Sequence, residues 1–405
     1  MPLGAAAAQS YDENPSGHAL YVLLDGRLTA SDGEPAWLPG GFGKARFGGG
    51  QNGDTRFRAR PVEANVVWQP RLTWSLDATI AVTAQQGQEH PVDLSEAYLS
   101  YRHDPVGPWR ASARLGLMWP PVSLEHSGPA WSVTDTISPS AINAWIGEEV
   151  KAAAAEASLS RKLGEGRVTG TVALFGFNDT AGTLLAFRGW ALHDEKATAF
   201  GQQPLPPLDA FMQTAQAPKT RPVIELDNRP GFYAKLGWSG AKANVAAFYY
   251  DNRGDPEAVD EYLQWGWRTR FANLSVRLDP DPNTTIRAQA MTGSTRMGYS
   301  MNGRIWVDTG FRSAFLMATR QVAHSANISG RIEAFGTRGR GSVLGSQTSE
   351  DGWAGTLAAK RGFGDHVMVL AELLHVESRR DDRARIGLAP RQRQTVAQLA
   401  VRVSR

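Results

Sequence analysis

The stretch Arg71-Leu-Thr-Trp-Ser-Leu-Asp-Ala-Thr-Ile-Ala-Val-Thr-Ala-Gln85 alternates between apolar and polar side chains along its whole length. Its even-numbered positions are all apolar, and its odd-numbered positions are polar except for Ala81. Successive side chains of a β-strand point to opposite faces of the sheet. The alternation therefore predicts one strand with an apolar face and a polar face.

The same alternation recurs along most of the chain, in segments of strand length separated by turn residues. Together with 71–85, the recurrences predict about sixteen strands. They lie near 18–28, 56–69, 93–102, 108–118, 148–160, 167–177, 231–238, 242–250, 265–278, 284–294, 307–320, 326–336, 353–361, 366–377 and 394–405.

The connections between these strands alternate in length. The segments 29–55, 119–147 and 178–230 are long, whereas the turns at Gln69-Pro70 and at Asp279-Pro-Asp-Pro-Asn283 are short. Barrels of bacterial outer membranes have an even number of strands, short turns at one end and long loops at the other. The sequence thus predicts an all-β chain forming a single transmembrane antiparallel β-barrel of about 16 strands, with infolded loops.

Composition removes several other classes of protein. The chain has 405 residues, of which 42% are apolar and 20% are charged, and none is cysteine. No apolar run approaches the length of a membrane-spanning helix, roughly 18 to 20 residues. The absence of cysteine excludes disulfide scaffolds, Cys nucleophiles and Cys-ligated zinc. The net charge of +3 is spread along the chain, so no nucleic-acid partner is expected.

The first residues suggest a targeting segment. Ala6, Ala7 and Ala8 resemble the small-residue cleavage site of a secretory signal peptide, although no basic segment and no full apolar segment precedes them. We expect 1–17 to be a residual signal or flexible N-terminus and 18–405 to form the barrel. A disordered alanine-rich tail is the alternative.

Aromatic residues give an independent indication of a membrane. Trp109 and Trp119 lie ten residues apart on the expected outer face of one strand. At a tilt of about 40° they would be roughly 25 Å apart along the membrane normal. An aromatic girdle at the short-turn end is predicted from Trp68, Trp74, Tyr101, Trp109 and Trp238, with Trp119 at the opposite border. The alternative is that these are core tryptophans of a soluble β protein.

Three segments carry a resemblance to a known family. They are Leu117-Met-Trp-Pro-Pro-Val-Ser-Leu-Glu125, Arg331-Ile-Glu333-Ala-Phe335 and Ala371-Glu372-Leu-Leu-His375-Val-Glu-Ser378. The chain resembles the sixteen-stranded phosphate-selective and related porins of Gram-negative bacteria over nearly its whole length. That resemblance implies an outer-membrane location and passive diffusion of small solutes. The anion-selective members use a lysine cluster, and the eight lysines of this chain are too few for one.

The last strand indicates a protein partner, the barrel assembly machinery. Ala397, Leu399, Val401 and Val403 share one face, as in the C-terminal strand that the barrel assembly machinery reads in the family. The family commonly ends in an aromatic residue at this position, where the present chain has Arg405. Other partners that the resemblance implies are outer-membrane lipid and lipopolysaccharide, with homotrimer and monomer both left open.

The 119–147 loop is the main candidate for a constriction. Ser138 followed by Pro139 has the pattern of a helix start. In porins such a loop folds into the barrel, which would place Glu125, His126, Asp135 and Asn143 at the pore. The alternative is an extracellular cap that never enters the lumen.

Alternation also predicts which side chains point into the lumen, with Glu125 added from the loop. Eight arginines and three strand glutamates in this set predict a weak preference for anions. Structural ion pairs within the lumen are the competing interpretation. The predicted pore-lining residues are Glu96, Arg102, Arg110, Arg114, Glu125, Arg277, Arg287, Gln289, Arg312, Arg320, Arg331, Glu333 and Glu372, and Tyr98 shares this face.

No catalytic motif stands out. The chain lacks H-E-x-x-H, G-x-S-x-G and P-loop patterns, and no cofactor or metal is expected. The leading hypothesis is therefore a passive outer-membrane porin. The rivals are an accessory barrel plugged by the 178–230 loop and, third, a secreted or outer-membrane β-rich enzyme.

Overall fold

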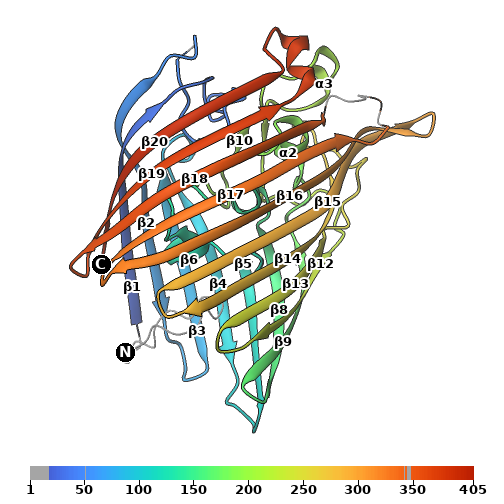
Figure 1. Ribbon diagram of the computed structural model, residues 1–405. Coiled ribbons are helices and arrows are strands. Elements are labelled where there is room, and N and C mark those ends of the chain that lie inside the picture. The colour runs from blue at the N-terminus through green and yellow to red at the C-terminus, as the bar shows by residue number, and fades with distance from the viewer. Residues whose placement is uncertain (1–17, 51, 342, 344–347) are drawn as a thin grey trace.

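The computed structural model describes residues 18–50, 52–341, 343 and 348–405. The expected signal segment 1–17 lies outside this part of the chain. Sixteen strands form one closed antiparallel sheet, seen in Figure 1 as a tilted barrel whose last strands lie beside the first. The barrel closes where β1 pairs with β20, from Leu23 opposite Ser404 to Ser31 opposite Val396. The predicted fold class is confirmed.

The barrel strands follow one another around the wall in sequence order. Their bounds are β1 His18–Ser31, β2 Arg56–Pro70, β3 Leu76–Gln85, β4 Val92–Arg102, β5 Trp109–Met118, β8 Ala152–Leu163, β9 Gly166–Gly176, β12 Gly231–Ser239, β13 Ala243–Asp251, β14 Arg268–Asp281, β15 Thr284–Met301, β16 Arg304–Ala323, β17 Ala326–Gly339, β18 Glu350–Phe363, β19 Val367–Arg379 and β20 Arg391–Ser404.

Several strand boundaries differ from prediction. Residues 71–75 form a turn closed by the Thr73 hydroxyl, which accepts the amide of Leu76 at 3.1 Å, so β3 begins only at Leu76. β8 begins at Ala152 because a helix occupies Glu148 and Glu149. The predicted 295–306 loop is a two-residue turn at Asn302-Gly303, where both residues have positive φ, as an Asn-Gly hairpin turn requires.

The two faces of the wall differ in what they contact. Leu274, Leu316, Ile332 and Leu357 project from neighbouring strands and are about half exposed or more. Residues between them along each strand point inward and are buried, as the alternating burial of β14 and β16–β18 shows. The outer wall is thus an apolar belt, and the inner wall packs against chain segments inside the barrel.

The connecting segments hold the remaining elements. Between β5 and β8 lie β6 His126–Gly128, η1 Pro129–Trp131, β7 Ser132–Val133 and α1 Ala141–Glu149; between β9 and β12 lie α2 Thr183–Phe187, β10 Gln203–Pro204, α3 Ala210–Ala215 and β11 Lys219–Thr220. The short η3 Asp381–Ile386 joins β19 to β20. No helix in the described part of the chain is long and apolar enough to cross a membrane.

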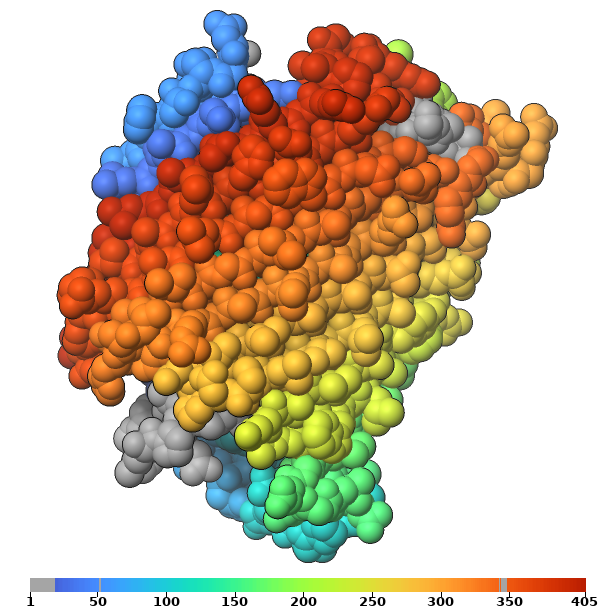
Figure 2. All heavy atoms as spheres, in the orientation of Figure 1, coloured from blue at the N-terminus to red at the C-terminus, as the bar shows by residue number. Residues whose placement is uncertain are grey.

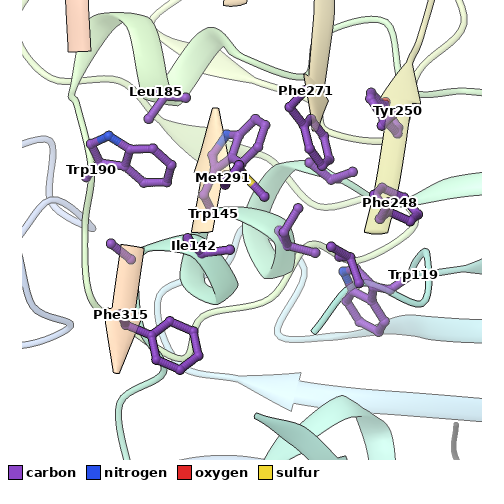
Figure 3. Packing of buried hydrophobic residues seen from close by; sticks show 14 of the residues in the cluster. Trp119, Ile142, Trp145, Leu185, Trp190, Phe248, Tyr250, Phe271, Met291 and Phe315 are labelled. Carbon is purple, nitrogen blue, oxygen red and sulfur yellow. The ribbon is translucent and has the colours of Figure 1, made fainter. Parts of the chain in front are cut away.

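An apolar core lies inside the barrel. Every residue of α1 is buried, and Trp145 packs edge-on against Phe271 of β14 at 5.3 Å and Trp190 at 6.0 Å between ring centroids. Figure 3 shows Ile142 and Trp145 among side chains from the barrel wall and from the segment that carries Leu185 and Trp190. The predicted infolding of the 119–147 loop is confirmed.

Candidate functional site in the lumen

The 119–151 loop leaves the wall directly after β5. Trp119 is only 2% exposed: its ring stacks on Trp131 with centroids 4.7 Å apart, and its Nε1 donates to the carbonyl of Gly147 at 3.2 Å. The prediction that Trp119 belongs to a membrane girdle is therefore wrong. The inward-outward alternation of β5 ends at Met118, and the chain then turns into the lumen.

Helix α1 begins two residues later than predicted. Ser140, not Ser138, is the N-cap, and its hydroxyl accepts the amide of Asn143. The backbone amides before and at the helix start are taken by carboxylates. Glu333 accepts from Ala141 at 2.7 Å, and Glu372 accepts from Ser138 at 3.0 Å. Negative charge at a helix N-terminus is stabilised by the helix dipole.

Arg331 ties these acids together from the inner face of β17. Its guanidinium donates to Glu125 at 2.7 Å and Glu333 at 2.9 Å, and also to the carbonyls of Ser138 and Pro139. All of these groups are buried. Four predicted pore-lining residues, Glu125, Arg331, Glu333 and Glu372, thus meet at one place, where they fasten the infolded loop to the wall.

A second anchor lies farther along the same loop. Asp135 pairs with Arg287 of β15 at 2.9 Å and with Lys360 of β18 at 2.8 Å. Burial favours the neutral acid, but the two cations outweigh it and lower the pKa of Asp135 below its ordinary value. Arg287 faces the lumen as predicted and is neutralised there by the loop.

The other loop residues that the sequence singled out are enclosed as well. Asn143 donates to Gln289 of β15 at 3.1 Å, and Gln289 in turn donates to the carbonyl of Val122 at 2.9 Å. The His126 ring lies flat on Trp131 with centroids 3.5 Å apart. Burial lowers the pKa of His126 well below its ordinary value, so this imidazole is neutral at pH 7.

The 177–230 loop packs on α1 through two adjacent acids. Glu148 accepts from Arg188 at 2.9 Å and contacts His193 at 2.8 Å. Glu149 accepts from the amide of Leu184 at 2.8 Å. Burial opposes ionisation of both acids, but Arg188 and His193 lower the pKa of Glu148 to about 2, whereas burial and the neighbouring Glu148 raise the pKa of Glu149 to about 7.

This raised pKa predicts a pH dependence. Between about pH 4.5 and pH 7 the folded protein holds a proton on Glu149 that the unfolded chain releases, so stability falls as pH rises through this window. Glu149→Gln should flatten that decline, by roughly 1 to 3 kcal/mol across the window. Urea unfolding in lipid vesicles at several pH values measures it, with exposed Glu257→Gln as control. A decline unchanged in Glu149→Gln would contradict the assignment.

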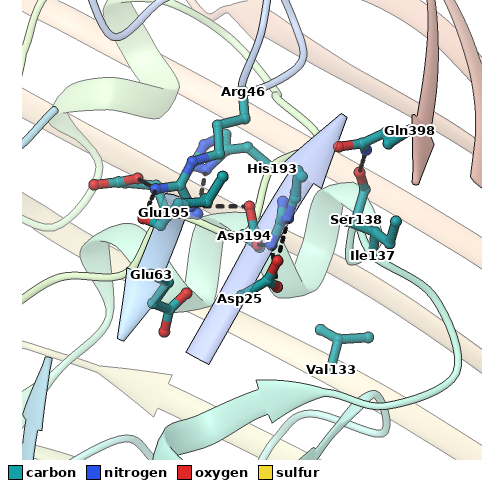
Figure 4. A network of polar contacts seen from close by, with 12 residues as sticks. Asp25, Arg46, Glu63, Val133, Ile137, Ser138, His193, Asp194, Glu195 and Gln398 are labelled. Atoms are coloured by element: carbon teal, nitrogen blue, oxygen red, sulfur yellow. Dashed lines mark hydrogen bonds and ion pairs between the residues drawn. The ribbon is translucent and has the colours of Figure 1, made fainter. Parts of the chain in front are cut away.

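Between the loops and the wall of β1, β2 and β20 lies a charged cavity of about 10 Å³, room for about one water. Asp25 and Arg402 face it from the wall and pair at 2.8 Å, while Asp194 enters from the 177–230 loop. Figure 4 shows Asp194 between Arg46 and the Asp25 side of the wall. Burial opposes the ionisation of Asp194, but Arg27 and Arg46 outweigh burial and hold the pKa of this carboxyl well below its ordinary value.

Sequence reasoning missed this part of the lining. The signal was nevertheless present, because Asp25, Arg27, Glu63 and Arg402 all lie within predicted strands. Asp25, Arg27 and Arg402 each lie next to an outward-facing apolar residue, namely Leu24, Leu28 and Val401. Strand alternation would therefore have placed these three charged side chains in the lumen. What the sequence could not show is that Asp194 and Lys196, far along the chain, complete the cluster.

The remaining predicted lining residues mostly have partners. Glu96 is buried on the inner face of β4, and Arg102 pairs with Asp77. Arg114 makes a two-pronged contact with Glu156 at 2.7 and 2.8 Å, and Arg277 contacts Asp279 at 3.0 Å. Arg110 is exposed on the inner face, and the described residues include no acidic partner for it.

Arg312 and Arg320 are not in the lumen. Along β16 the buried positions are Phe311, Phe315 and their alternates, whereas both arginines share the exposed outer face with Leu316. The prediction was wrong because the inner face of β16 is aromatic where it covers α1. The rule that polar residues face the lumen therefore exchanged the inner and outer faces of β16 in the prediction.

The predicted girdle residues other than Trp119 lie at one end of the barrel. Trp68, Tyr101, Trp109 and Trp238 are exposed at the ends of β2, β4, β5 and β12, and Trp74 is exposed in the β2–β3 turn. These are the ends joined by short turns. Their common depth in a membrane stays a prediction.

An acidic cluster outside the lumen core has a structural explanation. Carboxylate oxygens of Asp179, Glu225 and Asp227 lie within 4.8 Å of one another. Asp179 accepts the amide of Leu226 at 2.6 Å, and Glu225 accepts that of Phe177 at 2.8 Å. The acids thus order the loop in which they lie, and nothing else in the described residues points to a cation.

Comparison with known proteins identifies a shared fold. No family model and no curated protein matches the chain. Among solved structures it is similar to the outer membrane channel DcaP of Acinetobacter baumannii, with a TM-score of 0.58 and 11% identity over 97% of this chain and 99% of that one. An anion-selective porin from Comamonas acidovorans gives 0.54 and 9%, covering 96% and 99%.

A third similar structure is OmpF of Salmonella typhi in complex with daunomycin, with a TM-score of 0.53 and 10% identity over 96% of this chain and 99% of that one. These neighbours are outer-membrane proteins, and the fold of the present chain is that of an outer-membrane β-barrel. At such identities the likeness shows the fold and does not single out the phosphate-selective family.

Proposed function

We propose that this chain is a porin of the Gram-negative outer membrane, through which small polar solutes diffuse passively. The observation that carries the proposal is the combination of an apolar outer belt with a charged inner wall to which the 119–151 loop is fastened. Such a loop would set the narrowest part of the lumen. The proposal assigns no catalytic role to the chain and no cofactor.

The proposal includes partners. Outer-membrane lipid would contact the exposed apolar belt. Lipopolysaccharide would border that belt, and the barrel assembly machinery would insert the chain. A homotrimer is compatible with the trimer form known for OmpT of Vibrio cholerae, which has the same fold with a TM-score of 0.51, 9% identity, and coverage of 96% of this chain and 100% of that one.

Planar-bilayer recording of the detergent-purified chain tests this function. We expect discrete conductance steps from a protein whose gel mobility changes on boiling. A heat-modifiable barrel without conductance would instead favour an accessory barrel with a plugged lumen. The dense packing of α1 and residues 181–192 inside the barrel is the observation that favours this second candidate.

We further propose a weak preference for anions. Removing Arg312 and Arg320 from the lining leaves six arginines against the same three strand glutamates, and most of the six are paired with acids. The support now comes from Arg110, Lys162 and Arg167, which face the lumen near the short-turn end, and from Lys235 in the middle of β12, which donates to the carbonyl of Pro121 at 2.6 Å. The described residues include no acidic partner for any of the four.

Reversal potential under a salt gradient measures this preference. The wild-type channel should be weakly anion-selective, and neutralising Arg110, Lys162, Arg167 and Lys235 to glutamine should shift the potential toward cations, because fixed charge in a pore biases conduction. Arg320→Gln, on the outer face, is the matched control and should leave the potential unchanged. A wild-type channel selective for cations would refute the preference.

A further inference from the structure

Four arginines lie on the outer wall near the long-loop end, one on each of four adjacent strands. They are Arg270 of β14, Arg296 of β15, Arg312 of β16 and Arg338 of β17, and all are exposed. Each occupies a position that alternates with buried lumen-facing neighbours. Figure 2 shows the continuous outer surface of this half of the barrel, coloured yellow to orange.

Their height relative to the apolar belt follows from β16. Arg312 and Arg320 share the outer face, and the outward residues between them are Ala314, Leu316 and Ala318. Eight residues of a strand tilted by about 40° rise roughly 20 Å, close to the height of the lipid-facing band of such barrels. The two arginines therefore border the belt, Arg312 at the long-loop side and Arg320 at the short-turn side.

The upper arginines are short of acidic partners. Arg312 and Arg338 share the single carboxylate of Asp351, each at 3.7 Å, which is longer than a hydrogen bond. Arg270 and Arg296 make no ion pair within the described residues, although Asp251 and Asp308 lie opposite them in the strand register. Asp308 is instead paired with Arg340 at 2.8 Å, and Asp251 lies 4.0 Å from Arg268. Most of the guanidinium donors are consequently left for a ligand.

Small residues separate the arginines and fix their spacing. Arg270 is opposite Ser294, Ser294 is opposite Gly310, and Gly310 is opposite Arg338. Three strand spacings put the backbones of Arg270 and Arg338 about 14 Å apart. A headgroup that carries two phosphates matches a cluster of this width and lets each side of the cluster bind its own phosphate.

We propose that Arg270, Arg296, Arg312 and Arg338 form a binding site for the phosphates of a diphosphorylated glycolipid in the outer leaflet. The inference rests on the proposed outer-membrane location and deepens it. Guanidinium groups bind phosphate through paired hydrogen bonds, and arginines at the belt border place those donors at headgroup height. The acyl chains would lie against Leu274, Leu316 and Ile332.

The opposite half of the wall lacks this feature. The outward positions at the same end of β3, β5, β8 and β9 are Ala84, Leu117, Ala153 and Leu174. Outward arginines at this end also occur on β19 and β20, at Arg379, Arg391 and Arg393. General adaptation to an anionic membrane surface would distribute arginines around the whole circumference, so their concentration on the β14–β20 side favours a localised site. The four on the adjacent strands β14–β17 form its continuous part.

The test uses the full chain in nanodiscs of neutral phospholipid, with diphosphoryl lipid A as the added probe and native mass spectrometry as the readout. The variant Arg270→Ala/Arg296→Ala/Arg312→Ala/Arg338→Ala should bind the probe at least about tenfold more weakly than wild type. Arg320→Ala, at the other border of the same strand, should bind within about twofold of wild type. Lipid A without phosphates should bind as weakly as the fourfold variant.

Equal binding by wild type and the fourfold variant would overturn the site. So would release of the lipid by millimolar inorganic phosphate, because the cluster would then be a site for free anions. Conductance and heat-modifiable gel mobility are measured on the same preparations. A fourfold variant that conducts normally and still binds the lipid refutes only the glycolipid site. Wild-type protein that does not conduct and does not fractionate with the outer membrane refutes the proposed function.

Discussion

Replacing Arg331 by alanine should lower the free energy of unfolding by about 3 to 5 kcal/mol, because it leaves the buried carboxylates of Glu125 and Glu333 without their cation. The same change removes the donors to the carbonyls of Ser138 and Pro139. The loop that begins α1 would then be held by fewer contacts, so single-channel conductance should rise and fluctuate more. Urea unfolding in vesicles and bilayer recording measure the two effects.

Arg110→Ala is the matched control for this change. Arg110 also lies on the inner wall, but it is exposed and has no acidic partner in the described chain, so its removal should alter stability by less than about 0.5 kcal/mol. A third variant, Arg331→Lys, keeps the positive charge but loses the planar guanidinium. Its loss of unfolding free energy should lie between those of Arg331→Ala and Arg110→Ala. If Arg331→Ala and Arg110→Ala unfolded alike, the cluster would not be holding the loop.

Trp145→Ala should open a cavity inside the barrel and loosen both infolded loops. The indole contacts Phe271, Phe311 and Trp190, with ring centroids 5.1 to 6.0 Å away, so truncation should cost about 3 to 5 kcal/mol of packing free energy. Loops that lose this packing become accessible to protease before the wall unfolds. We therefore expect cleavage within residues 119–151 or 177–230 at urea concentrations that leave the barrel heat-modifiable.

Trp353→Ala controls for the loss of an indole from the chain. Trp353 lies on the outer face of β18 and is 49% exposed, so its removal should leave protease resistance of the loops unchanged. Limited proteolysis followed by mass mapping of the fragments compares the variants. Cleavage patterns that match between Trp145→Ala and wild type would mean that α1 does not stabilise the loops.

The sequence was sufficient for the barrel because the period-2 pattern is a local property of each strand. Residues 76–85 could be assigned to a strand without knowing what the strand would pair with. The alternation of long and short connections then fixed the antiparallel order. Errors at strand ends, as at Leu76 and Ala152, arose where a turn or a helix competed for the same residues.

The site was predicted less completely, and β16 shows why. Its inner face carries Phe311, Phe315 and Met317, all buried against segments inside the barrel, so the usual rule that polar residues face the lumen failed. Arg312 and Arg320 were consequently assigned to the wrong face. For Arg331 and Glu333 the rule succeeded, because β17 places charged residues on its inner face.

What the sequence by itself determined about this protein is therefore the wall: the number of strands, their order and the apolar belt, all set by backbone geometry acting over a few residues. Only the tertiary structure decided what fills the wall. The contacts of Glu125 with Arg331 and of Asp25 with Arg402 join residues 206 and 377 positions apart. No local periodicity encodes such pairs, because each forms only after the barrel has closed and the loops have folded into it.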